Sequence, residues 1–331
     1  MKAAIYVILV VLAAIAPFFI PEAFVYILGL SFLFIILVVS WDVMVGYTGQ
    51  VNLGHTVFVG VGAYTAALLQ SPVRLQHLLG FTIPKVPIFI SIISGGIIAA
   101  LIGFFIGIIT LRLKGYYFAL VTAILPLVFM QTVFVWRKVF GGEEGFSIGL
   151  ENSLSNTILG KYYIALIIMV ICVLSMLFIV KSQIGLKFKA IREDEELAES
   201  IGIDTTKYKV IAFIVSSFFA GIGGAAIIHY RITVSPDLYD IPLMLLIILS
   251  AVIGGLGTIY GPVFGAFIIY LAKNWWLKEI LSNLLKIAPI PINDDMILYL
   301  MLIVVGILMP QGIYVELKKR SWIAKKSNSS I

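Results

Sequence analysis

Ten apolar stretches constrain this chain more than any other feature of its sequence. A helix that crosses a bilayer needs about 20 apolar residues, and 61% of the 331 residues are apolar whereas 12% are charged. A soluble domain averages about 25% charged residues. We therefore expect an all-α integral membrane protein with about ten transmembrane helices in a single domain, residues 1–331. The candidate spans are residues 3–20, 23–41, 46–69, 86–109, 116–136, 162–180, 210–229, 241–253, 262–276 and 296–309.

Basic residues predict the orientation of these spans, because Lys and Arg beside a span stay on the cytoplasmic side. They gather at the N-terminus, after the fourth stretch, between the sixth and seventh stretches, and in the C-terminal tail. If every stretch crosses once, all four places fall on one side of the membrane. We therefore expect both termini to be cytoplasmic. Arg137 and Lys138 depart from the rule, with Glu143 and Glu144 close by.

The stretch GYTGQVNLGH, residues 46–55, places three glycines and several polar side chains between two apolar runs. Irregular backbone at membrane depth persists only where protein or a water-filled cavity surrounds it. A second stretch, GGLGTIYGPVFG from residue 254, repeats its glycine pattern with small gaps. Paired glycine-interrupted segments point to the binding site or pathway of a transporter. The candidate pathway residues are Gly49, Gln50, Asn52, Gly54, His55, Gly257 and Gly261.

Ordinary helix packing is the alternative explanation of these glycines, because small residues let helices approach closely. It accounts less well for Gln50 and Asn52, while a hydrogen bond between helices is the simpler explanation of His55. The repeated pattern also suggests two weakly related halves. They are parallel if each stretch crosses once, and inverted if a segment near residues 241–262 is re-entrant.

The segment 181–209 is a charged loop with six basic and six acidic residues. Residues 185–200 have helical character, Gly202 is placed to end that helix, and Asp204 is placed to cap the next one. Such a helix beside a membrane is a solvated face, an interfacial helix or a docking element for a partner. Its expected apolar stripe consists of Leu186, Ala190, Ile191, Leu197 and Ile201.

Four motifs in order along the chain resemble the LivM-type permeases of ABC transporters for branched-chain amino acids. They are GYTGQVNLGHTVFVGVGAYTAALL from residue 46, LRLKGYYFALVT from residue 111, AIREDEELAESIGIDTTKYKVIAFIVSSFFAGIGGA from residue 190, and GGLGTIYGPVFGAFI from residue 254. The resemblance covers residues 46 to about 269. The segment ELAESIG, residues 196–202, also keeps part of the looser EAA-type permease motif, with Leu197 in place of its second Ala.

The resemblance implies a type II ABC importer-like fold, with broken or re-entrant segments, that moves branched-chain or other hydrophobic amino acids. The implied partners are a second, LivH-type permease subunit, two ATP-binding subunits and an extracytoplasmic solute-binding protein. The implied location is the cell (inner) membrane of a prokaryote, with membrane lipid around the chain and no nucleic-acid partner. The segment 181–209 would couple to the ATPases. Its candidate coupling residues are Gly185, Arg192, Glu193, Asp194, Glu196 and Gly202.

The sequence indicates a transport subunit that does not hydrolyse ATP itself. It lacks G-x-x-x-x-G-K-[ST], the motif of a P-loop, so we expect ATP on the partner ATPases and no cofactor or metal in this chain. The sequence contains no cluster of catalytic residues, which a membrane enzyme would need. It also contains no segment that resembles a selectivity filter, which a channel would need.

Two other transport functions remain as alternatives. One is an ion-coupled secondary transporter of small amino acids or amides, and the other is an ABC permease for urea or short amides. Ion coupling usually needs carboxylates within spans, and we place Asp42 at the end of a span, where interfacial water solvates it.

Overall fold

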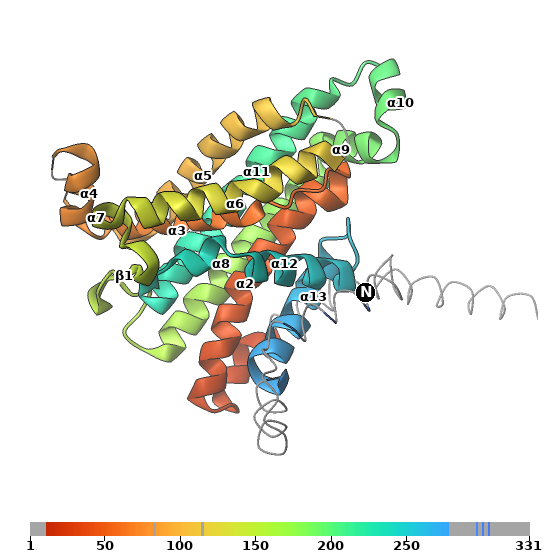
Figure 1. Ribbon diagram of the computed structural model, residues 1–331. Helices are drawn as coiled ribbons and strands as arrows, with labels where there is room; N and C mark the ends of the chain where they lie inside the picture. Colours follow the sequence, from red (N-terminus) through yellow and green to blue (C-terminus); the bar gives the residue numbers. More distant parts are fainter. Residues whose placement is uncertain are drawn as a thin grey trace, which may run out of the picture.

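In the computed structural model, the chain is described over residues 11–81, 84–113 and 116–277 and at positions 296, 300 and 304. This part is a bundle of α-helices (Figure 1). Residues 3–10 of the first predicted span and most of the tenth lie outside the described residues. Among the described residues, five helices are long and apolar enough to cross a membrane. They are α2 (Glu22–Thr48), α5 (Ile88–Thr110), α6 (Tyr116–Val135), α8 (Ile158–Lys181) and α11 (Thr205–Arg231).

Two of these helices form the centre of the bundle. About three quarters of the most apolar window is buried in α2 and α11, against a third or less in α5, α6 and α8. Helix α3 (His55–Leu69) packs against α5 and α11, and α8 packs against α2. A side chain on Gly62 of α3 would overlap the backbone of Gly221 in α11. Close helix packing therefore explains the glycines at this crossing.

A sharp bend follows α3. Helix α4 (Pro72–Leu79) turns by 107° from α3, so this pair is either a sixth, broken span or a re-entrant loop. Near α4 lie α7 (Arg137–Phe140) and a short ladder in which β1 (Phe146–Ser147) pairs antiparallel with β2 (Thr233–Val234). Figure 1 shows this group at one end of the bundle. The short 3-10 segments are η1 (Ala16–Phe18), η2 (Gly142–Glu144), η3 (Leu150–Asn152) and η4 (Pro236–Tyr239).

The opposite end carries α9 (Gln183–Glu193) and α10 (Glu195–Ser200), between α8 and α11 (Figure 1). The sequence predicts one continuous helix over 185–200, and this prediction is wrong. Asp194 is extended (φ −160°) and its carboxylate accepts the N–H of Leu197 at 3.0 Å, which ends α9 and starts α10. The predicted caps of the next turn are confirmed. Gly202 is left-handed (φ +89°), and Asp204 accepts the N–H of Lys207 at 2.9 Å.

The last described helices are two short ones, α12 (Ile241–Gly254) and α13 (Tyr260–Leu271), followed by a π-helical segment, η5 (Ala272–Leu277). With 14 residues, α12 is about 21 Å long and falls short of the roughly 30 Å hydrocarbon core. Side chains on Gly261 or Gly265 would overlap the backbone of α12. The two helices therefore pack closely against each other around a break at residues 255–259.

A junction between two glycine-rich breaks

The polar stretch 46–55 is a break between two helices inside the bundle. Helix α2 continues to Thr48, and Gly49 ends it in the left-handed region (φ +76°). The predicted span 46–69 therefore begins too early, because its first three residues are the last turn of α2. The break exposes Gly49 and Val51 but buries Asn52, Gly54 and His55.

Hydrogen bonds from two helices, α2 and α6, and one bond within the break hold this break in place. The indole of Trp41 donates to the Asn52 carbonyl at 2.7 Å, and the Asn52 side chain accepts the N–H of Gly54 at 2.9 Å. The N–H of Leu53 donates to the Thr122 hydroxyl of α6 at 3.2 Å. A side chain on Gly54 would overlap the Thr122 carbonyl. Asn52 and Gly54 thus fix the path of the backbone beside α6.

His55 joins α3 to α2. Its Nε2 lies 3.0 Å from the Ser40 hydroxyl and 3.1 Å from the Leu37 carbonyl, and the ring is fully buried. This geometry matches the hydrogen bond between helices that the sequence offers as the simpler explanation of His55. Its Nδ1 has no hydrogen-bond partner among the described residues.

The two glycine-rich breaks meet at Gly46 and Gly257. A side chain on either residue would overlap the backbone of the other, so the α12–α13 break lies directly against the last turn of α2. The Asp42 carboxylate accepts the N–H of Gly257 at 2.7 Å. The repeated glycine pattern in the sequence therefore corresponds to one place of contact. Gly261 packs against α12 instead.

Asp42 is the main correction to the sequence-based site. The sequence predicts that interfacial water solvates it at a span end, but its side chain is fully buried. The expected span ends at residue 41, whereas α2 continues to Thr48 and carries Asp42 into the protein. One carboxylate oxygen has no partner among the described residues. A charged residue in an otherwise apolar helix is the sequence signal for such a position.

Arg192 connects the junction to the helices at the loop end. It lies near the end of α9, and its guanidinium donates to the Gly46 carbonyl. A side chain on Gly257 would overlap the same guanidinium, and the Arg192 stem lies beside Gly49. We define the inner junction as Asp42, Gly46, Arg192 and Gly257. Arg192 is exposed, as are the expected coupling residues Glu193, Asp194 and Glu196, but its guanidinium reaches the junction.

The outer face of α9 and α10 differs from the predicted apolar stripe. Leu186, Leu197 and Ile201 are 57%, 61% and 69% exposed, while Ile191 is buried. Phe188, which the stripe omits, is fully buried. The break at Asp194 rotates the two halves of the segment relative to each other, so one stripe cannot continue through both. We call the exposed side chains Leu186, Leu197, Ile201, Glu193 and Glu196 the outer face.

Two local contacts position this pair of helices. A side chain on Gly185 would overlap the Val180 backbone, so glycine permits the turn from α8 into α9. Lys209 of α11 forms a largely buried ion pair with Glu195 of α10. The α9–α10 pair is therefore fixed to the transmembrane helices on both sides.

A family model for the permease component of branched-chain amino acid transport systems matches residues 23–306. The chain belongs to this permease family. It is similar to the high-affinity branched-chain amino acid transport system permease protein LivM of Escherichia coli K12 and of Salmonella typhimurium LT2, each 27% identical over 293 residues. The alignments cover 80% of this chain and 66% of each LivM protein.

The permease is also similar to LivH, another permease protein of the high-affinity branched-chain amino acid system. The Salmonella typhimurium LT2 protein is 22% identical over 291 residues, which cover 84% of this chain and 90% of LivH. No solved structure matches the chain. Among the described residues, no group of three or more His, Cys, Asp and Glu is placed to hold a metal ion.

Proposed function

We propose that this permease is the transmembrane subunit of an ATP-driven ABC importer for branched-chain or other hydrophobic amino acids. The observation that carries the proposal is the inner junction in a chain of this family. One arginine from the charged loop contacts the two glycine-rich breaks that interrupt the membrane helices. A movement of α9 is therefore transmitted directly to irregular backbone, which needs a protein-lined or water-filled surrounding.

The proposed assembly contains a second, LivH-type permease subunit, two ATP-binding subunits and an extracytoplasmic solute-binding protein that delivers the substrate. The outer face supports the ATPase contact, because it combines exposed leucine and isoleucine side chains with acidic ones. Apolar groups surrounded by polar ones are typical of protein interfaces. ATP is bound by the partners, and this chain supplies the pathway.

The proposed topology has ten spans, two weakly related halves and both termini in the cytoplasm of a prokaryote, with residues 181–209 on the cytoplasmic side. The support for this topology is the course of α8. This helix runs once from the end of the bundle that holds Arg137 and Lys138 to the end that holds the charged loop. The ten-span count treats α12 and α13 as separate crossings and makes the halves parallel. A single re-entrant segment there would make the halves inverted, with fewer crossings.

A second candidate function, ion-coupled secondary transport, gains support from Asp42, because a buried carboxylate in a span is what ion coupling requires. The importer is favoured, because the matching family model and the LivM relatives are permease components of branched-chain amino acid transport systems.

One experiment separates the two functions. The permease complex is reconstituted in vesicles with the solute-binding protein and radiolabelled leucine, with and without the ATPases. The importer proposal requires uptake only with ATPases and ATP. Uptake at an equal rate without them, driven by an ion gradient, would establish secondary transport instead. If urea or acetamide competes with leucine uptake while isoleucine and valine do not, the transported substrate is an amide and not an amino acid.

A further inference from the structure

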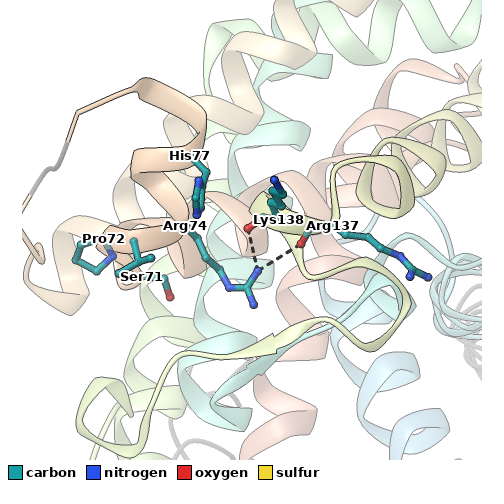
Figure 2. Close-up of a pocket in the computed structure, with 7 residues that line it drawn as sticks. Ser71, Pro72, Arg74, His77, Arg137 and Lys138 are labelled. Atoms are coloured by element: carbon teal, nitrogen blue, oxygen red, sulfur yellow. Dashed lines mark hydrogen bonds between the residues drawn. The ribbon is translucent and has the colours of Figure 1, made fainter.

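A basic pocket lies between α4 and α7, at the end of the bundle opposite α9 and α10 (Figure 2). Its volume is about 480 Å³. The polar side chains that line it are Ser71, Arg74, His77, Arg137 and Lys138, and no described Asp or Glu is among its lining residues. The pocket is therefore suited to an anionic group.

Arg74 builds the pocket. Its guanidinium donates to the carbonyls of Lys138 at 3.2 Å and Arg137 at 3.5 Å, and lies 4.3 Å from the centre of the Phe146 ring. These contacts hold α4 against α7 and keep a positive charge at the pocket. Arg137 directs its guanidinium away from Arg74 (Figure 2) and forms an ion pair with Glu143 at 3.5 Å. Within the described residues, no carboxylate forms an ion pair with Arg74 or Lys138.

An apolar groove of about 460 Å³ borders the same end of α6. Leu127, Val128, Val135 and Trp136 line it, and the next residue, Arg137, already lines the basic pocket. Val135 is 74% exposed, and Val73 on the rim of the pocket is 70% exposed. An exposed Trp at the end of a span and a short amphipathic helix bent away from its span are both features of the membrane interface.

We propose that this face binds one anionic phospholipid, with its phosphate in the basic pocket and an acyl chain along the groove on α6. Clustered Lys and Arg side chains at a membrane surface attract anionic lipid head groups, and the charge of this pocket complements a phosphate. An acidic protein would match the pocket but leaves the adjoining apolar groove on a poorly buried span unexplained. The inference does not depend on the transported substrate.

The test uses the purified permease complex titrated with phosphatidylglycerol or phosphatidylcholine, with bound lipids counted by native mass spectrometry. We expect the wild-type complex to prefer phosphatidylglycerol. Lys138→Gln removes an exposed charge and should weaken its binding about fivefold. The matched control is Lys85→Gln, because Lys85 is exposed, forms an ion pair with Glu151 at 3.0 Å, and does not line the pocket. This control should bind as wild type.

Three results would overturn the proposal. The first is equal binding of both lipids by the wild-type complex. The second is a loss of affinity in Lys85→Gln as large as that in Lys138→Gln. In the third, Lys138→Gln binds phosphatidylglycerol as wild type does but loses affinity for the solute-binding protein, which would assign the pocket to a protein partner. Size-exclusion chromatography and leucine uptake of each variant establish that the complex has assembled.

Discussion

At the residue scale, four side chains or backbone groups from three separate segments meet at the inner junction. Asp42 accepts the N–H of Gly257, and Arg192 donates to the carbonyl of Gly46. The first contact joins α2 to the break after α12, and the second joins α9 to the last turn of α2. The backbone groups freed by the two breaks thereby find partners inside the protein, as a membrane environment requires.

Asp42 gives the first prediction. In Asp42→Asn the amide oxygen still accepts the Gly257 N–H, so uptake should stay within about tenfold of wild type, since exchanging a charged for a neutral acceptor costs about 1 kcal/mol. Asp42→Ala leaves that N–H unpaired, which costs about 1–3 kcal/mol, and should reduce uptake further. The measurement is ATP-driven leucine uptake at equal protein level. Complete loss of uptake in Asp42→Asn would indicate that the carboxylate carries an ion or a proton.

Gly54 gives the second prediction. Gly54→Leu places a side chain on the Thr122 carbonyl, and overpacking of this kind costs about 1–3 kcal/mol. We expect the break to shift away from α6 and uptake to be lost while the protein still reaches the membrane. Gly80→Asn is the matched control, because a side chain at Gly80 meets open space and Asn tolerates its positive φ. Normal uptake in Gly54→Leu would show that close approach to α6 is not required.

At the scale of elements, hydropathy predicts helices well where one apolar run coincides with one helix. Helices α5, α6, α8 and α11 lie where the sequence places them, because each is a long apolar run bounded by polar residues. The end of α2 is missed, because the polar residues 46–55 favour an early end, whereas Val43, Met44 and Val45 prolong the helix to Thr48. The 107° bend after α3 and the break at Asp194 depend on local caps and tertiary contacts.

The glycine pattern shows how much of the site can be predicted from the sequence. It points to Gly257 and to the segment that contains Gly46, and these residues do meet. It cannot assign Arg192 to them, because that contact depends on how α9 folds back across the end of α2. The guanidinium that was expected to bind a partner is used within the chain.

The outer face gives the third prediction. Glu196→Lys reverses an exposed charge on α10 that makes no contact in the inner junction. If this face binds the ATPase, as proposed, like-charge contact should weaken that binding at least about tenfold, and ATP-driven uptake should fall with it. Co-purification of the ATPases with the permease measures the effect. Glu144→Lys makes the same reversal at the opposite end of the bundle and should leave the complex intact. Equal ATPase recovery in both variants would contradict an ATPase contact at α10.

At the scale of the whole molecule, the two ends of the bundle differ in construction. The α9–α10 end combines an exposed face with an arginine directed inward to the breaks, while the α4–α7 end carries a basic pocket beside an apolar groove. Helices α2 and α11 run through the buried centre between them. The proposed importer uses this asymmetry, because energy enters at one end and the substrate enters at the other.

The coupling ratio of an Arg192 variant tests the central claim most directly. In the complete reconstituted complex, Arg192→Gln removes the charged donor to Gly46, which costs about 1.5–3 kcal/mol, so leucine uptake should fall about 10- to 100-fold. ATP hydrolysis and ATPase recovery in Arg192→Gln should stay near wild type. The control Arg112→Gln should keep normal ATP hydrolysis, ATPase recovery and uptake. Unchanged uptake in Arg192→Gln, or loss of the ATPases together with uptake, would contradict an inward link between α9 and the two breaks.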